Sequence, residues 1–577
     1  MKLAEAGTFD IECADWDVFR CGAFSRGNES AVVWDGDSLF AALVLRGGTW
    51  WSHSGGRYDI VWVVSEAVKR GLAFNATMAG SRIISLRVAG ATFRDSAALA
   101  PMRLADVARL GGAEKAPTGL RCECGEEGCA GFCVLRRPLS RSERTAVGDY
   151  CLQDCRALSA GLDAIGRYAT EHGITLAGTI GGSAWKTAAD WCELDPASKS
   201  LARYRTLRRG YYGGRTEVFR TQGDRGHRYD IHSSYPAALA RTPLPVGESF
   251  YVRGEVATRA FLKGADGVYD ATVCVPDCDV PPLPHRRPDR LYYPTGTFRG
   301  FWTGLTLRNA IDAGARVRTI HRGHAWKKSA PLLAPFAERV WALRDAAPTK
   351  EWKTWVKFLA NSCTGKFAQS PERGDVVFLP SEHPGSPPYM PPRHRPVRDV
   401  ETGTIATRYA VGVSPCAHVV YAAHLTSEAH AELHRELRTA VEPWYTDTDS
   451  VYSRDVLTRR IGPALGEWGY EGEARDWHAQ APKLYRYRDE HDTWHVRGKG
   501  MPGLTSDGFD ALARGEQWVN ARGVMTLRSA IRATGESLFR RREIKRGTHP
   551  VAGWVGGRLI GKDGLTTRAP RVIDITR

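Results

Sequence analysis

The sequence predicts a multidomain α/β protein, of the α+β kind in which strands and helices alternate irregularly. Its 577 residues are too many for one hydrophobic core, so two to four domains are expected. Short strand-like runs that carry carboxylates alternate along the chain with amphipathic helical stretches. A hydrophobic content of 42% and a charged content of 25% are typical of a globular protein.

The net charge of +16 favours a polyanionic partner, with nucleic acid ahead of an anionic membrane surface. The sequence shows neither a charged leader before an apolar segment nor an apolar run of about 18 residues, so we expect neither secretion nor a membrane span. The 13 cysteines are scattered apart from one cluster, which suits a reducing compartment better than a disulfide framework.

Three stretches in the first 160 residues carry acids at the ends or faces of regular elements. A strand over 8–13 bears two of them, a glycine turn over 51–59 ends in a third, and a helix from 149 into 158 carries a fourth. Tyr150 and Asp154 lie four residues apart, so they share one helical face. Single acids of this kind are common, but together they are enough to bind two metal ions: Asp10, Glu12, Asp59 and Asp154.

Four cysteines fall within 12 residues between the second and third of these stretches: Cys122, Cys124, Cys129 and Cys133. Four thiols separated by glycines suit one tetrahedral Zn²⁺ of structural type. Their spacing differs from the usual pairs of C-x2-C knuckles, so a hairpin whose cysteines carry no metal is the alternative.

A basic stretch with Arg203, Arg205, Arg208 and Arg209 leads into the run 211–215, Tyr-Tyr-Gly-Gly-Arg. Interleaved cations, rings and glycines suit a contact that follows a nucleic-acid backbone. A solvated basic loop is the alternative.

The run 228–238 reads as a strand that delivers Asp230, a turn, and a helix that begins near Pro236. Asp230 would be a metal ligand, Ser233 would face a phosphate, and the ring of Tyr235 would lie against a sugar. An ordinary turn with a capping acid explains the same pattern.

Two helices follow from about residue 329, the first with Phe336, Val340, Leu343 and Arg344 and a break near Pro348. The second begins by Thr349 and places Lys353, Lys357 and Asn361 on one stripe. These cations and the amide suit a triphosphate, although a solvated face would look the same.

Prolines then punctuate 369–411, which predicts an inserted extended hairpin that is not part of a core. A helix over 417–438 leads to the stretch 444–452, where Asp447 and Asp449 alternate with β-prone residues. Residues i and i+2 of a strand point the same way, so both acids would project from one side of a hairpin and need a cation such as Mg²⁺. A polar turn capped by its own side chains is the alternative. Basic, aromatic strands follow at 482–487 and 497–501, and a basic run at 540–546 is a further candidate for phosphate contacts.

Taken together, the motifs resemble those of family B DNA polymerases, above all the compact protein-primed type of phages and linear plasmids. Asp10 to Glu12, Ser54 to Asp59 and Tyr150 to Asp154 resemble the three exonuclease motifs. Eight motifs stand in the family's order, the other five being Tyr211 to Gly214, Asp230 to Pro236 (motif A), Lys357 to Gly365 (motif B), Tyr445 to Ser450 (motif C) and Lys483 to Tyr485.

The resemblance implies an RNase H-like 3′–5′ exonuclease domain over 1–165 and a right-hand polymerase domain over 166–577. The latter would comprise palm (205–325 and 412–480), fingers (326–368), the inserted hairpin (369–411) and thumb (481–577). It implies that Asp230 and Asp449 bind two Mg²⁺ ions, which Mn²⁺ would replace, with Asp447 in support.

By the same resemblance, Asp10, Glu12 and Asp154 bind the exonuclease metals, with Asp59 and Tyr150 completing that site. Tyr235, Arg344, Lys353, Lys357 and Asn361 would hold the nucleotide. DNA would contact Ser54, Tyr58, Tyr211, Gly213, Gly214, Lys483 and Tyr485.

The implied partners are primer–template DNA, dNTPs and a terminal protein that primes synthesis, with no membrane. A monomer in the cytoplasm of a bacterial host is expected. Alternatives are a family B polymerase that uses nucleic-acid primers, a nuclease whose polymerase half only binds DNA, and a non-catalytic binder. Three positions depart from the family pattern: Ser54 replaces Asn, Ser234 replaces Leu and Thr364 replaces Tyr.

Overall fold

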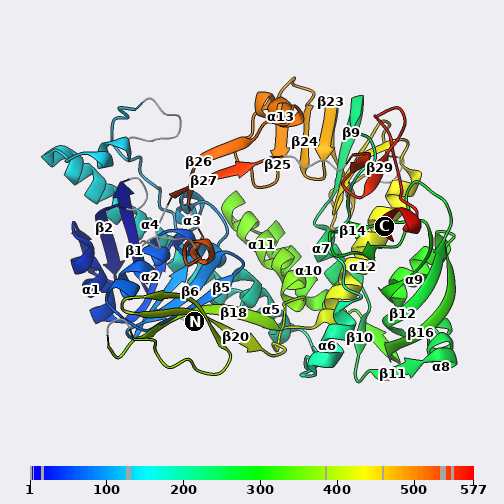
Figure 1. Ribbon diagram of the computed structural model, residues 1–577, viewed down its shortest axis with the longest axis horizontal. Coiled ribbons are helices and arrows are strands. Elements are labelled where there is room, and N and C mark those ends of the chain that lie inside the picture. The colour runs from blue at the N-terminus through cyan, green and yellow to red at the C-terminus, as the bar shows by residue number, and fades with distance from the viewer. Residues whose placement is uncertain are drawn as a thin grey trace.

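The computed structural model describes residues 3, 5–14, 18–124, 132–383, 386–457, 461–524, 526–532, 541–547 and 552–576. They form two lobes, each built around a sheet, and helices α10 (Ala334–Asp345) and α11 (Lys350–Phe367) lie between them (Figure 1). The mixed α/β class predicted from the sequence is confirmed. Among the helices that these residues form, none has the length and apolarity needed to cross a membrane.

A ten-stranded sheet organises the N-terminal lobe, in the order β19-β20-β18-β5-β6-β7-β4-β1-β2-β3. Strand β4 pairs in parallel with β1 and β7 at its centre. The seven N-terminal strands are β1 (Gly7–Ala14), β2 (Val18–Arg26), β3 (Glu29–Val33), β4 (Gly48–Ser52), β5 (Phe74–Ala79), β6 (Arg82–Val88) and β7 (Ala91–Asp95). The helices of this lobe are α1 (Gly36–Arg46), α2 (Asp59–Lys69), α3 (Leu104–Leu110) and α4 (Arg141–Glu171).

The alternation of β1 explains how this lobe presents its acids. Phe9 and Ile11 are buried in the core, so Asp10 and Glu12 face the other side of the sheet. Helix α4 packs against β1 and β2 on that side and brings Asp154 towards them. The predicted helix over 149–158 is confirmed as the middle of α4.

The proline-punctuated segment 369–411 is part of the N-terminal core, so the prediction of a separate hairpin was wrong. It forms three strands, β18 (Glu372–Pro380), β19 (His394–Val400) and β20 (Gly403–Val411), and β18 pairs with β5. Phe378 is 1% exposed and its ring stacks on Phe74 with centroids 5.9 Å apart. Pro387, Pro388, Pro391 and Pro392 lie between β18 and β19, and Pro396 lies on the edge strand β19, so they interrupt no central ladder.

A seven-stranded sheet organises the other lobe, in the order β25-β24-β23-β9-β22-β21-β8. Its strands are β8 (Thr216–Val218), β9 (Gln222–Ile231), β21 (Pro443–Asp447), β22 (Ser450–Ser453), β23 (Trp468–Ala481), β24 (Leu484–Arg488) and β25 (Trp494–Gly498). Helix α7 (Ser234–Arg241) directly follows β9, and helix α12 (Val419–Thr439) directly precedes β21. Because β24 and β25 continue this sheet, the expected thumb range 481–577 begins inside the sheet.

Helix α4 runs beyond the expected domain boundary at 165 and packs on the fingers helices. Tyr168 stacks on Trp352 of α11 with ring centroids 4.2 Å apart, and Arg109 of α3 pairs with Glu351 at 3.6 Å. One hydrophobic cluster therefore includes residues of α4, α11, α12 and α5 (Ile180–Trp191). The two lobes share this core.

Residues 250–326, most of the first expected palm range, form a separate four-stranded sheet with its own core. Its order is β11-β16-β12-β15, and helices α8 and α9 cover it. These elements are β11 (Phe250–Arg253), α8 (Gly254–Leu262), β12 (Asp266–Val275), β15 (Gly296–Thr303), α9 (Gly304–Asp312) and β16 (Arg316–Trp326).

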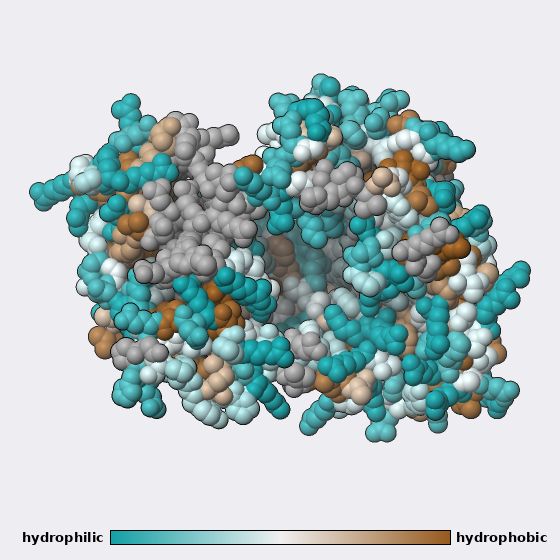
Figure 2. Space-filling model, in the orientation of Figure 1, coloured by the Kyte–Doolittle hydropathy of each residue, from teal (hydrophilic) through white to brown (hydrophobic). Residues whose placement is uncertain are grey.

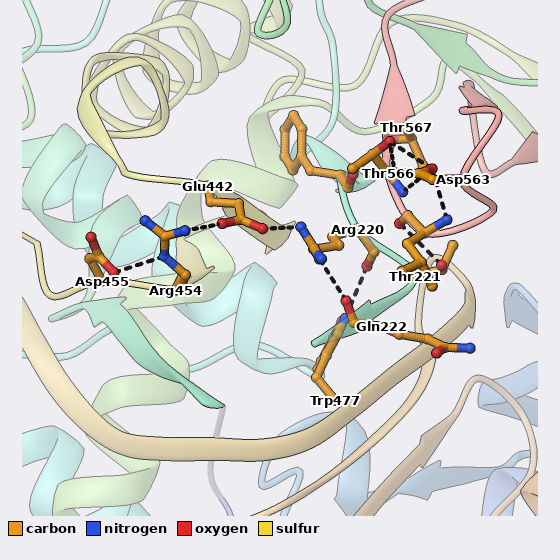
Figure 3. A network of polar contacts seen from close by, with 12 residues as sticks. Arg220, Thr221, Gln222, Glu442, Arg454, Asp455, Trp477, Asp563, Thr566 and Thr567 are labelled. Atoms are coloured by element: carbon orange, nitrogen blue, oxygen red, sulfur yellow. Dashed lines mark hydrogen bonds and ion pairs between the residues drawn. The ribbon is translucent and has the colours of Figure 1, made fainter. Parts of the chain in front are cut away.

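The C-terminal residues return to the palm-like sheet. Strands β28 (Trp554–Val555), β29 (Arg558–Ile560) and β30 (Thr567–Arg568) form a small sheet, and the Thr567 amide donates to the Phe219 carbonyl at 2.9 Å. Figure 3 shows Thr566 and Thr567 beside Thr221, and a chain of ion pairs from Arg220 through Glu442 to Arg454. Of the predicted basic run 540–546, Arg540 lies outside the described residues and Arg541–Arg546 form β27, paired with β26 (Trp518–Val524).

Candidate active sites

Asp230, near the end of β9, and Asp449, in the turn between β21 and β22, meet at one end of the seven-stranded sheet. Ser450 of β22 is the register partner of Asp230 on β9, and the Ile231 amide donates to the Asp449 carbonyl at 2.9 Å. Burial, and after it the nearby Asp449, raise the pKa of Asp230 to about 7. Burial likewise raises the pKa of Asp449 to about 6, with Asp447 adding to the shift. Buried carboxylates this close favour a shared cation.

Lys357 of α11 lies near this pair of acids. Its charge lowers the pKa of both Asp230 and Asp449, although burial outweighs it. The expectation that the stripe on α11 holds a triphosphate stays a prediction. Glu471 of β23 also acts on Asp230 and raises its pKa, and sequence reasoning missed it because it belongs to no motif.

Asp447 does not project beside Asp449 from one strand, as its spacing predicted. It ends β21, whereas Asp449 stands in the turn after Thr448, whose φ is 68°, so the two acids do not alternate along one strand. The Lys483 ammonium donates to both Asp447 oxygens at 2.6 Å, and Thr216 Oγ1 donates at 3.0 Å. Asp447 therefore holds Lys483 beside the site and has its charge compensated.

Gly213 and Gly214 precede Arg215, and Gly214 packs against the turn that carries Asp449. A Cβ on Gly214 would lie 2.4 Å from Thr448 Oγ1, and the Thr448 amide donates to the Arg215 carbonyl at 2.7 Å. Gly214 thus lets the loop lie against the turn that carries Asp449, so its glycine is explained by protein packing. The basic residues before it belong to helix α6 (Leu201–Arg208), and Arg208 donates to the Ala368 carbonyl.

The other residues predicted for this site lie on α7, α10, α11, β24 and the loop before β8. Burial raises the pKa of Tyr235 to about 12, with contributions from Tyr211 and Asp449, so both rings lie at the site. Tyr485 packs on Tyr445 with ring centroids 4.9 Å apart. Lys353 is exposed, Asn361 half-buried, and the Arg344 guanidinium lies over the Trp341 ring and pairs with Asp345 at 3.1 Å. Thr364 is 4% exposed and Ser234 is 5% exposed, so both face the interior.

The four acids predicted in the N-terminal lobe come together in a second site. The Ile11 amide donates to Asp59 Oδ1 at 3.2 Å, and burial raises the pKa of Asp10 to about 7, with Asp154 adding to it. Burial, then Asp10, Asp154 and Asp59, raise the pKa of Glu12 well above its usual range. The pKa of Asp59 is likewise raised, first by burial and then by Asp10.

Lys115 approaches this acidic cluster and was missed by sequence reasoning. Its ammonium pairs with Asp154 Oδ2 and lies 4.6 Å from the centre of the Tyr150 ring. It stands in a segment without helical or strand periodicity, so nothing in the sequence pointed to it. The other predicted residues lie nearby in the chain: Ser54 has φ of 59° before η1 (Gly55–Arg57), and Tyr58 caps α2 beside Cys13.

A pocket of about 900 Å³ lies between Ser54, Lys115 and residues of helix α11. Ser54 and Lys115 line one side of it, and Thr354 and Phe358 of α11 line the other. Figure 2 shows the surface hollowed between the two lobes in this region.

The donor atoms of both sites suit hard divalent cations. Asp10 Oδ2 and Asp154 Oδ1 are buried without a hydrogen-bond partner among the residues that the structure describes. Buried acceptors of this kind destabilise the protein unless a cation or protein donor compensates them. Clustered carboxylate oxygens are the ligands that Mg²⁺ prefers.

Comparisons with known proteins agree with this geometry. A family model described as DNA polymerase type B, organellar and viral, matches residues 141–392. The DNA-directed DNA polymerase of Enterobacteria phage PRD1 is 24% identical over 464 residues, or 78% of this chain and 75% of that protein. Phi29 DNA polymerase complexed with primer–template DNA matches 94% of this chain and 99% of its own, with a TM-score of 0.68 and 13% identity. The chain has the fold of Phi29 DNA polymerase, and its sequence is similar to type B DNA polymerases over residues 141–392.

Other relatives match a smaller part of this chain. A probable DNA polymerase of Neurospora intermedia is 23% identical over 316 residues, which are 48% of this chain and 30% of that protein. A probable DNA polymerase of Ascobolus immersus is 29% identical over 170 residues, 29% of this chain and 14% of its own length. The chain thus spans less than a third of the length of these fungal relatives.

Proposed function

We propose that the protein is a DNA-directed DNA polymerase that adds dNTPs to a primer 3′ end. The observation that carries this proposal is the pair Asp230 and Asp449, which β9 and the motif C turn hold together under Lys357. The type B family model and the PRD1 polymerase support the same conclusion.

The side chains around the pair have distinct roles in this proposal. Asp230 and Asp449 would hold two Mg²⁺ ions, which stabilise phosphate charge and activate the primer hydroxyl. Lys357 binds the triphosphate, and the Tyr235 ring lies under the sugar and excludes a 2′-hydroxyl. Arg344, Lys353 and Asn361 extend the nucleotide site along the fingers.

Lys483 and Tyr485 would contact the primer terminus. Asp447 fixes the Lys483 ammonium through two bonds of 2.6 Å, so the lysine is oriented before DNA binds. Tyr211 and Gly213 lie in the loop behind the catalytic turn and contact the template–primer backbone.

We further propose a 3′–5′ exonuclease in the N-terminal lobe, with water as the nucleophile. Asp10, Glu12 and Asp154 would hold its metal ions, Asp59 fixes β1 through the Ile11 amide, and Tyr150 orients the water. The pocket lined by Ser54 and Phe358 would carry single-stranded DNA to this site.

Priming by a terminal protein and synthesis with strand displacement are also proposals, supported by the likeness to the PRD1 polymerase. The separate sheet of residues 250–326 is the candidate surface for the terminal protein. A monomer in the host cytoplasm fits these roles. Initiation on a nucleic-acid primer is the alternative, and extension of a primed template with and without added terminal protein separates the two.

The experiment that tests the two active sites uses reciprocal variants. Asp449→Ala is expected to abolish nucleotide addition and to leave degradation of single strands nearly intact, because the sites use separate acids. Asp10→Ala with Glu12→Ala is expected to do the reverse. Primer extension and single-strand degradation are measured on the same preparations. Incorporation by Asp449→Ala within about tenfold of wild type, only ~1.4 kcal/mol in barrier, would contradict the assignment.

A further inference from the structure

Three cysteine thiols lie together beside the exonuclease-like site. The Sγ atoms of Cys122, Cys124 and Cys133 are all within 4.8 Å of one another, and those of Cys122 and Cys124 are 3.6 Å apart. Thiolates bound at about 2.3 Å to a tetrahedral Zn²⁺ lie roughly 3.8 Å apart. A disulfide would bring its sulfurs to about 2.05 Å. The spacing in the structure is that of ligands around one ion.

The backbone around the thiols is arranged as at a metal site. The Glu123 amide donates to Cys133 Sγ at 3.2 Å, a bond that stabilises a thiolate and orients it. We propose that Cys122, Cys124 and Cys133 bind one structural zinc ion. Soft thiolates select zinc over the Mg²⁺ of the catalytic sites. Cys129, the fourth cysteine of the sequence cluster, lies outside the described residues, so the site is defined by the other three.

Glu123, between two of the ligands, connects the cluster to the start of α4. The Arg137 guanidinium bonds Glu123 at 3.2 Å and Glu143 at 2.7 Å. Glu143 in turn accepts from the Ser140 amide at 2.8 Å, in the capping box that begins α4. The zinc ion therefore fixes a loop that is bonded to the helix carrying Tyr150 and Asp154.

A second contact leads from the cluster into the exonuclease-like site itself. Phe132, next to Cys133, packs edge-on against the Tyr150 ring with centroids 5.5 Å apart. Lys115 covers another part of the same ring. The zinc ion is thus a positioning element: by fixing Cys133 it holds Phe132 on Tyr150, and Tyr150 keeps its place above Asp154. This second step rests on the proposed exonuclease, whereas zinc binding does not.

Metal analysis tests the ion. Reduced protein purified without added metal is expected to contain about one zinc per chain, released when the thiols are titrated with a mercurial. Cys122→Ser with Cys133→Ser should lose it, and Cys278→Ser, at an exposed cysteine elsewhere, should retain it. A wild type with almost no zinc, or an unchanged zinc content in the double variant, would overturn the proposal.

Activity tests the positioning role. In the double variant, the exonuclease kcat on single strands is expected to fall by about tenfold or more, roughly the effect of a misplaced catalytic group. Polymerisation and the unfolding temperature of the polymerase lobe are expected to stay unchanged. The single variant Cys133→His, in which a histidine replaces the thiolate as zinc ligand, should keep both the zinc ion and the exonuclease rate that the double variant loses. Normal exonuclease rates in the zinc-free variant would refute the positioning role. Wild-type protein with zinc but without exonuclease activity would instead refute the proposed exonuclease.

Discussion

At the scale of single residues, each candidate active site contains acids that repel one another, and neighbouring cations compensate the charge of only some of these acids. Asp447 is compensated by Lys483, whereas burial raises the pKa of Asp230 and of Asp449, with Asp449 adding to the shift of Asp230 and Asp447 to that of Asp449. This difference assigns the roles within motif C: Asp447 positions a lysine, and Asp449 is left for a cation. Both residues looked equivalent in the sequence.

The raised pKa values predict how stability depends on pH in metal-free protein. Unfolded aspartates ionise near pH 4, but Asp230 and Asp449 keep their protons to about pH 7 and about pH 6 in the folded state. The folded state then binds more protons than the unfolded state between these values, so the free energy of unfolding falls as pH rises from about 4 to 7. We expect the free energy of unfolding to decrease by on the order of a few kcal/mol, measured by denaturant unfolding at each pH.

Added Mg²⁺ should reverse that loss at pH 8, where the acids are ionised, and have little effect at pH 5. Asp230→Asn with Asp449→Asn is the control, since it should flatten the part of the pH dependence that comes from this site. Equal stabilisation by Mg²⁺ in wild type and control would show that the ion binds elsewhere.

Gly214→Ala is expected to slow nucleotide addition by about tenfold or more, because an added Cβ meets Thr448 at 2.4 Å and shifts the catalytic turn. Thr448→Gly in the same chain removes the atoms that clash and accepts the positive φ of 68°. Partial recovery in this double variant is the expected result, measured by single-turnover extension.

Gly213→Ala separates packing from DNA contact, because its Cβ would meet nothing within 4 Å. A loss there would come from the DNA side and should appear in the affinity for primer–template. If Gly214→Ala extends primers at the wild-type rate, the loop does not position the turn.

At the scale of elements, the strands β18 and β20 join a later segment of the chain to the N-terminal sheet. Val376 and Phe378 are buried against β5, although residues 372–380 lie between motifs B and C. A segment expected to be an inserted hairpin outside any core is therefore anchored in the N-terminal sheet. We propose that it acts in strand displacement, and this role has to be tested without disturbing that sheet.

Deleting 372–408 is expected to lower the unfolding temperature and abolish exonuclease activity, because it removes core strands. The buried side chain of Phe378 alone stabilises the folded protein by about 3–5 kcal/mol. Replacing only residues 383–392 by a short Gly-Ser linker keeps β18, β19 and β20 in place. This smaller change should spare exonuclease activity and single-nucleotide addition but stop long synthesis through duplex. Continued copying of long duplex would exclude the tip from strand displacement.

At the scale of the whole molecule, the last residues of the chain support the polymerase site from behind. Arg558 is 0% exposed and donates to Thr567 Oγ1 at 2.8 Å and to Glu217 Oε1 at 3.3 Å. Glu217 also pairs with Arg215, whose carbonyl accepts from the Thr448 amide. A buried chain of charges therefore runs from the C-terminal sheet to the catalytic turn.

Arg558→Met is expected to reduce polymerisation and to cost about 1–3 kcal/mol, mainly from lost hydrogen bonds. The protein should still fold, since Arg215 and Glu217 remain as a neutral buried pair. Arg454→Met is the matched control, because it breaks the half-exposed pair with Glu442 in Figure 3 and should cost at most about 1 kcal/mol. Extension rates and unfolding temperatures are compared, and equal effects of the two changes would disprove the support role.

The sequence by itself determined the acids, their order and the elements that carry them, because spacing within a strand, turn or helix is local. Asp10 and Glu12 on β1, Tyr150 and Asp154 on α4, and Lys357 on α11 all lie on the elements predicted for them. Only the tertiary structure decided which distant groups meet these residues. Lys115 beside Asp154, Lys483 on Asp447, Arg558 on Glu217 and β18 beside β5 join residues 36 to 341 positions apart. Such pairings depend on how whole elements pack, and neither periodicity nor spacing along the chain records that packing.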